Sequence, residues 1–290
     1  AAVGRERGVV LSEERARDTP AYRVFKKRLE FMLKGQRLPT RYPIGDVEVL
    51  RTAPASQLSA FYNHYYRPEG AVLIAVGDFN PDEMEAKIRA RFGDWKGVGE
   101  AGAKPDLGQI AKRGTEARLV VEPGAPLTIK IAWARPPDLA PDNLANRRDE
   151  LMRQLGLAVL NRRLSAIARG EQPPFLGAVA FKTDQARSAE IVMLNVSAEP
   201  EGWRAALAAA EAEQRRAVKY GVRQDELDRE IEEVRAAAKT AVAGAATRRP
   251  QDLAAEILQS LSDHSVVTKP ADELAMFETA VKGLKAETVS

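Results

Sequence analysis

Hydrophobic residues recur every three or four positions through most of this chain, and that spacing predicts a protein built largely of α-helices. In one early segment Tyr22, Phe25 and Leu29 fall on a single helical face, and Gly35 is a typical residue for ending such a helix. The pattern predicts helices over residues 4–17, 20–35, 46–50, 54–66, 80–92, 143–169, 201–220, 224–246, 252–262 and 271–284.

Five shorter segments have the pattern of β-strands. Residues 71–76 form a continuous apolar run, which is typical of a buried strand, while Leu127, Ile129 and Ile131 alternate with polar neighbours. The predicted strands cover residues 71–76, 117–121, 127–133, 176–182 and 190–196, and the spacing of the last two suits a hairpin.

The order of these elements predicts an α+β fold, in which antiparallel or mixed sheets pack with helices in two related domains. The strand, turn and helix pattern of residues 73–92 recurs at 191–210, which favours two α+β units over one doubly wound sheet. Residues 98–115 are rich in glycine and lack periodicity, as linkers do. We therefore expect a first domain at 1–97, a linker at 98–115 and a second domain at 116–290 that is largely helical after residue 200.

Composition narrows the classes of partner. The 44 Lys and Arg residues nearly balance 41 Asp and Glu, and they are interspersed along the helices, so we expect no nucleic-acid partner. The absence of cysteine excludes disulfides, thiolate metal sites and a cysteine nucleophile. No apolar run approaches the ~20 residues of a membrane span, so we expect none.

The sequence contains no self-contained catalytic constellation. His64 and His264 are the two histidines, and neither a His-x-x-Glu-His motif nor its reverse is present. Ser262, Asp263 and His264 are adjacent, but consecutive helical residues do not face one another. We therefore predict no catalytic residue and no metal ligand in this chain.

Several stretches, taken in order, resemble the insulinase/pitrilysin-type (M16) zinc metallopeptidases, in particular the large bacterial zinc proteases of that group. They read RGVVLSEERARDTP, RYPIG, FYNHYYRPEGAVLIAVGDF and FGDW, and the likeness is close over residues 5–95. It continues more loosely through VLNRRLSAIAR and PPFLGAVA in the second half.

This resemblance implies a zinc peptidase of homologous α+β units that form a closable chamber. An inverted zinc motif would supply two ligands and a general-base glutamate, and the chain begins after the point at which that motif would lie. We therefore expect a first domain truncated at its N-terminus. The third-ligand position of the family falls on Gly4, while Glu6 matches a second glutamate that a one-turn adjustment would bring into use. Zinc is expected in the intact parent, with none bound to this chain, which alone is predicted to be inactive.

The resemblance also indicates where an extended peptide would bind. In the family a second-domain strand holds the N-terminal side of the substrate through backbone hydrogen bonds. The corresponding residues are Leu176, Gly177, Ala178, Val179 and Phe181. The small residues there, including Ala180, would let another backbone approach. The alternative is an interior strand whose small residues accommodate a helix, and the sequence leaves both open.

The resemblance thus implies part of a zinc-dependent metallopeptidase that hydrolyses peptides in a chamber, with this chain as scaffold and substrate-binding wall. The alternative is a non-catalytic M16 homologue that acts as a structural or partner subunit. The partners expected are peptide substrates and the remaining M16 domains or a homologous subunit. The resemblance favours a bacterial periplasm or cell envelope.

Overall fold

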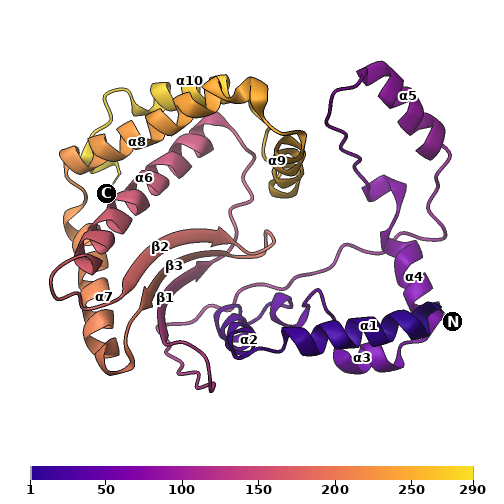
Figure 1. Ribbon diagram of the computed structural model, residues 1–290, viewed down its shortest axis with the longest axis horizontal. Helices are drawn as coiled ribbons and strands as arrows, with labels where there is room; N and C mark the ends of the chain where they lie inside the picture. The colour runs from indigo at the N-terminus through magenta and orange to yellow at the C-terminus, as the bar shows by residue number, and fades with distance from the viewer. Residues whose placement is uncertain (1, 290) are drawn as a thin grey trace. The chain divides into compact units, whose positions relative to one another are not determined.

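The computed structural model describes residues 2–289, whose helices and strands fall into two units (Figure 1). The first unit contains the residues up to Ala125 together with Pro250–Ala255. The second contains Pro126–Arg249 and the residues from Glu256 onward. The combination of many helices with one small antiparallel sheet confirms the predicted α+β class.

The first unit consists of helices joined by loops. Its helices are α1 (Ala2–Arg17), α2 (Pro20–Met32), α3 (Val47–Thr52), α4 (Ala55–Tyr65) and α5 (Pro81–Phe92). The side chains of Thr19, Asp46 and Asn80 accept hydrogen bonds from first-turn N–H groups of α2, α3 and α5. These N-caps satisfy donors that a helix start leaves unpaired, and the three helices begin within one residue of the positions that the sequence pattern predicted.

The glycine-rich segment that follows α5 passes beside the end of α2. The Ala111 N–H donates to the Lys34 carbonyl at 2.8 Å, and Gln36 forms an isolated antiparallel bridge with Gly108. Gly35 has a φ of +94°, and a Cβ at that position would lie 2.5 Å from a backbone oxygen of the segment. Glycine is therefore required where these two backbones cross.

Two of the predicted strands are absent from the described residues. The runs 71–76 and 117–121 have no strand assignment, and Val72 and Leu119 are 68% and 87% exposed. An apolar run forms a strand only where a neighbouring strand takes up its backbone hydrogen bonds. No strand of the described part of the chain pairs with either run, so the strand predictions there are wrong.

The second unit contains a three-stranded antiparallel sheet with the order β1-β3-β2. Its strands are β1 (Thr128–Arg135), β2 (Gly177–Asp184) and β3 (Glu190–Ser197). β2 and β3 form the predicted hairpin, with Gly177 opposite Ser197 and Asp184 opposite Glu190. β3 is therefore the central strand, and β1 and β2 are the edges of the sheet that the described residues form.

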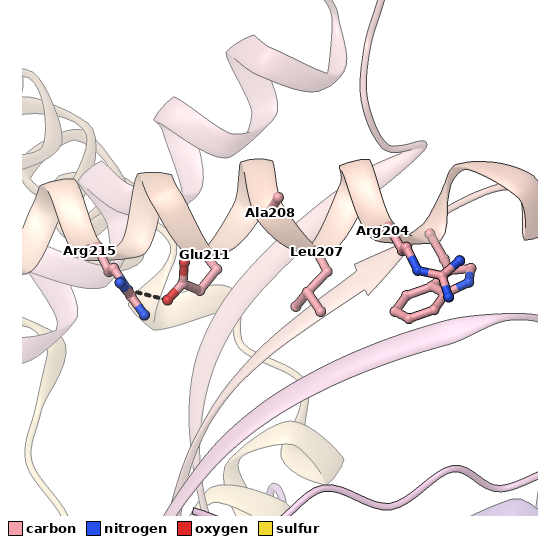
Figure 2. A pocket seen from close by; sticks show the side chains of 6 residues that line it. Arg204, Leu207, Ala208, Glu211 and Arg215 are labelled. Carbon is pink, nitrogen blue, oxygen red and sulfur yellow. Dashed lines mark ion pairs between the residues drawn. The ribbon is translucent and has the colours of Figure 1, made fainter.

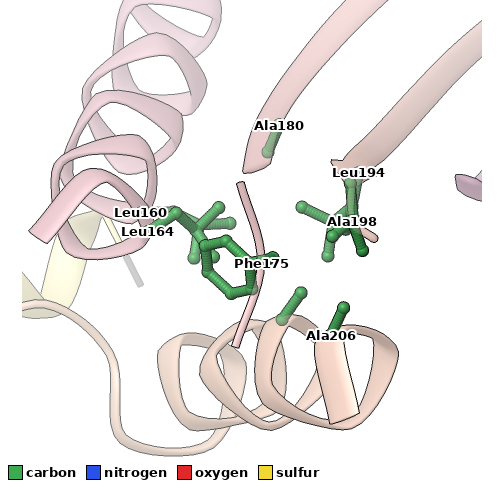
Figure 3. Close-up of a cluster of buried hydrophobic side chains, with 9 residues drawn as sticks. Leu160, Leu164, Phe175, Ala180, Leu194, Ala198 and Ala206 are labelled. Atoms are coloured by element: carbon green, nitrogen blue, oxygen red, sulfur yellow. The ribbon is translucent and has the colours of Figure 1, made fainter. Parts of the chain in front are cut away.

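Helices α6 (Leu144–Ala168) and α7 (Trp203–Tyr220) pack on one face of this sheet (Figure 3). Because side chains alternate along a strand, Ala180, Leu194 and Val196 all point toward these helices. The buried cluster comprises Leu160, Leu164, Phe175, Ala180, Leu194, Val196, Ala198, Ala206 and Ala210. It fixes the position of α6 over β2.

The chain continues through α8 (Gln224–Ala243), α9 (Pro250–Asp263) and α10 (Pro270–Val281). α8 and α10 lie beside α6 (Figure 1), where a second buried cluster joins the three helices. That cluster comprises Met152, Leu155, Leu227, Ile231, Phe277, Val281, Leu284 and Ala286. Among the residues that the structure describes, no helix combines the length and the apolar character needed to cross a membrane.

Candidate functional site

Strand β2, which contains most of the predicted peptide-binding residues, lies at one edge of the sheet (Figure 1). In the same register that pairs β2 with β3, the N–H of Gln185 donates to the Ala189 carbonyl at 2.8 Å. Backbone groups of alternate residues point to opposite sides of an antiparallel strand. The odd-numbered residues of β2 therefore bond to β3, and the backbone groups of Ala178, Ala180 and Lys182 point to the other side.

The predicted residues occupy both faces of the sheet. Val179 and Phe181 are exposed, at 42% and 38%, on the face opposite α6, whereas Ala180 is buried in the α6 cluster. Leu176, directly before β2, is also exposed, and a Cβ built on Gly177 would meet nothing within 4 Å. Ala180 thus packs against α6, while the surroundings of Gly177 are open.

A side chain of α6 bonds to the backbone at this edge. Asn161 Nδ2 donates to the Ala180 carbonyl oxygen at 2.8 Å, and its Oδ1 accepts from the Ala180 N–H at 2.7 Å. One side-chain amide therefore makes both of the backbone hydrogen bonds that an adjacent strand residue would make. The sequence did not indicate this contact, because Asn161 and Ala180 are 19 positions apart along the chain. The one local signal is an asparagine, a poor helix former, beside the buried Leu160.

The far end of β2 is tied to its neighbours by charge pairs. Lys182 Nζ lies 2.5 Å from Glu150 Oε2 on α6 and 3.4 Å from Glu190 Oε2 on β3. Glu190 is buried and accepts from Arg135 Nε of β1 at 2.6 Å. Burial alone would raise the pKa of Glu150, but the hydrogen bonds and the charge attraction of Lys182 and Arg153 together outweigh burial and hold that pKa below its usual range. These pairs join all three strands to α6.

One side of α7 carries an open depression of about 420 Å³ (Figure 2). Its lining residues are Trp203, Arg204, Leu207, Ala208, Glu211 and Arg215. The Arg204 guanidinium lies 4.5 Å from the Trp203 ring centroid, and Arg215 pairs with Glu211. Both cations of the depression thus have a partner on the same helix, so the lining is typical of a helix surface.

The described residues do not fit a catalytic zinc ion. Gly4, at the position that the resemblance assigns to the third ligand, has no side-chain donor, and Glu6 is exposed on α1. His64 lies in α4, whereas His264 follows α9 in a left-handed conformation. A catalytic zinc site takes three protein ligands, and no group of three histidine, cysteine, aspartate or glutamate side chains in residues 2–289 is arranged to hold a metal.

Comparison with known proteins links the chain to one peptidase family. A family model described as the peptidase M16 inactive domain matches residues 52–234, which is more than half of the chain. A zinc protease PQQL-like protein of Arabidopsis thaliana is 30% identical over 175 residues, covering 59% of this chain and 18% of that protein. The chloroplastic stromal processing peptidase of Pisum sativum is 25% identical over 289 residues, covering 79% of this chain and 23% of that protein.

The fold has a solved counterpart. The first half of the periplasmic protease PqqL from Escherichia coli superposes with a TM-score of 0.84 at 21% sequence identity. The alignment covers 99% of this chain and 61% of that structure. The chain also spans about a fifth of the length of the two plant relatives. This chain therefore corresponds to a part of each of these proteins.

Proposed function

We propose, since this chain belongs to the peptidase M16 family, that it forms part of a zinc-dependent metallopeptidase and supplies scaffold and a peptide-binding wall. In this proposal the peptide adds to β2 as a further strand. Binding by strand addition draws its affinity from main-chain hydrogen bonds, so it suits an enzyme part that holds peptides of varied sequence.

The observation that carries the proposal is the position of β2 at the edge of the sheet. The outward backbone groups of Ala178 are the natural partners for a peptide, and Gly177 adds no side chain that would obstruct it. Leu176, Val179 and Phe181 are exposed beside this edge, where they would contact alternate side chains of the peptide. These are the five residues that we propose as the peptide-binding site.

The reactive centre is proposed to belong to the rest of the parent protease. When bound there, zinc would polarise the scissile carbonyl and lower the pKa of its water. We assign no chemical step to the residues of this chain, because Gly4 offers no ligand atom and the described acidic residues do not converge on a metal.

A non-catalytic M16 subunit is the second candidate. Gly4 at the apparent ligand position favours it, as does the description of the matching family model as an inactive domain. The amino-acid sequence encoded directly before Ala1 separates the two candidates. An inverted zinc motif there supports the peptidase, and the absence of such a motif supports the subunit.

The wider setting follows from the same family. We propose that other M16 domains or a homologous subunit pack against this chain, and that the parent acts in a bacterial periplasm, as the related PqqL protease does. We also retain the domain organisation of 1–97, 98–115 and 116–290 as a proposal.

Peptide binding by this chain is directly testable. The probe is a fluorescein-labelled octapeptide of alternating threonine and valine with a terminal lysine, titrated against the 290-residue chain by fluorescence anisotropy. We expect saturable binding, and we expect it to be lost for a matched peptide that is N-methylated at every second residue, because that peptide cannot pair along an edge. Equal binding of the two peptides would show that β2 does not hold them by strand addition.

A further inference from the structure

We propose that Asn161 is a latch on the edge of β2, which an extended peptide must displace before it can pair along the whole strand. This inference rests on the proposed peptide-binding role of β2. It adds a residue of α6 that determines how much of the edge a peptide can use.

The latch occupies the middle of the edge. Ala178, Ala180 and Lys182 are the successive outward-facing residues, separated by about 6.4–6.8 Å along the strand. Asn161 uses both backbone groups of Ala180, at 2.8 and 2.7 Å. A peptide that meets the latched edge can therefore pair with Ala178 on one side of the amide, and it cannot continue to Lys182.

The movement that opens the latch is confined to one short side chain. Helix α6, which carries Asn161, is anchored to the sheet beside that residue, because Leu160 and Leu164 are buried in the cluster under α6. Asn161 itself is half-buried, so rotation about its side-chain torsions can bring the amide to water. The peptide would then supply the hydrogen bonds that Ala180 loses, and no buried backbone group would be left unpaired.

The latched state also protects the free chain. An edge strand presents unpaired N–H and C=O groups that invite pairing with other chains. The Asn161 amide covers one such pair of groups without adding a strand, and the charge pairs of Lys182 constrain the adjacent end. The arrangement thus restricts indiscriminate pairing while leaving Ala178 as the point of first contact.

The test compares the wild-type chain with Asn161→Ala, using the fluorescein-labelled octapeptide and amide hydrogen exchange resolved at Ala180. We expect the probe to bind Asn161→Ala about tenfold more tightly, because the peptide no longer competes with two hydrogen bonds. In the free variant the Ala180 amide should exchange at least tenfold faster, and the probe should slow it again. Asn146→Ala is the matched control, since Asn146 also lies on α6 but donates to the Pro141 carbonyl.

Each remaining outcome decides the matter. If Asn161→Ala folds but binds the probe no more tightly than the wild-type chain does, Asn161 is not a latch. The proposal that β2 binds peptides is then unaffected. If neither protein binds the probe saturably, β2 does not bind peptides by strand addition, and the proposed latch is refuted as well. If Asn161→Ala does not fold, Asn161→Asp replaces it, because it keeps an acceptor for the Ala180 N–H and frees the carbonyl. We expect about threefold tighter binding for that variant, and unchanged affinity would overturn the latch.

Discussion

Arg163 on α6 forms a two-point ion pair with Glu226 in the first turn of α8. Its Nε donates to Oε1 at 2.8 Å and its Nη2 to Oε2 at 2.5 Å. The same Nη2 donates to the Gly221 carbonyl at 3.2 Å, and Glu226 accepts the Arg223 N–H at 2.9 Å. Because only 15% and 18% of the two side chains are exposed, the pair fixes the start of α8 against α6.

Removal of one partner of this pair should destabilise the second unit. We expect Arg163→Met to lower the free energy of unfolding by about 2–3 kcal/mol, because it leaves the Glu226 carboxylate largely buried without its cation. Urea unfolding followed by circular dichroism measures the change. Arg215→Met is the control, since Arg215 is 76% exposed and its pair with Glu211 should contribute less than about 1 kcal/mol. Equal losses in the two variants would contradict a special role for Arg163.

The Glu226 carboxyl should make the stability of the protein depend on pH. Hydrogen bonding from Arg163 lowers the pKa of Glu226 and outweighs the opposing effect of burial. A carboxyl with a lowered folded pKa stabilises the protein fully above its unfolded pKa of about 4.3, and that stabilisation disappears as the pH falls through the folded value. We expect the free energy of unfolding to fall below about pH 4.3, and to fall less in Glu226→Gln. Parallel profiles for the two proteins between pH 3 and 7 would exclude Glu226 as a source of the acid sensitivity.

Proline substitutions at two neighbouring positions distinguish the N–H groups of β2 that point outward from those that bond to β3. Ala178→Pro removes an outward N–H, which an edge strand tolerates, so we expect a folded chain whose affinity for the octapeptide is at least about tenfold lower. Val179→Pro removes an N–H that points to β3 and should cost about 3 kcal/mol of stability. Anisotropy and thermal unfolding report the two effects. If Ala178→Pro proves the more destabilising variant, the assignment of the outward side is incorrect.

The exposed run at 71–76 should promote self-association. It is a continuous apolar segment with Leu73 51% exposed, and it has no strand partner in the described part of the chain. We expect Leu73→Lys to reduce the weight-average mass of concentrated samples in sedimentation experiments. Val218→Lys is the control, because Val218 is 73% exposed on α7 and single exposed apolar residues rarely drive association. A similar reduction by both variants would point to charge rather than to the run.

Zinc binding by this chain should be weak. Gly4 has no ligand atom, and Glu6 alone would supply a single carboxylate, whereas a catalytic zinc site takes three protein ligands. We expect well under one equivalent of zinc to remain after dialysis, as measured by mass spectrometry, and no chelator-sensitive peptide hydrolysis. The variant Gly4→Glu should retain no more zinc. One retained equivalent together with hydrolysis would show that the ligand assignment is mistaken.

Helix prediction succeeded where the relevant physics is local. The cap residues Thr19, Asp46, Asn80 and Asn143 each precede a helix whose first turn they hydrogen-bond. Strand prediction succeeded for the β2–β3 hairpin and failed at 71–76 and 117–121. Apolar character is necessary for a buried strand, but a strand also needs a partner, which no local pattern contains.

The sequence by itself determined the family and the α+β class, because ordered motifs and hydrophobic periodicity are properties of the chain alone. It also singled out the small residues at Gly177, Ala178 and Ala180. Only the tertiary structure decided that β2 lies at an edge and that Asn161 bonds to its backbone. Those facts depend on which segments meet in space, and the packing of α6 on the sheet brings together residues that the sequence holds apart.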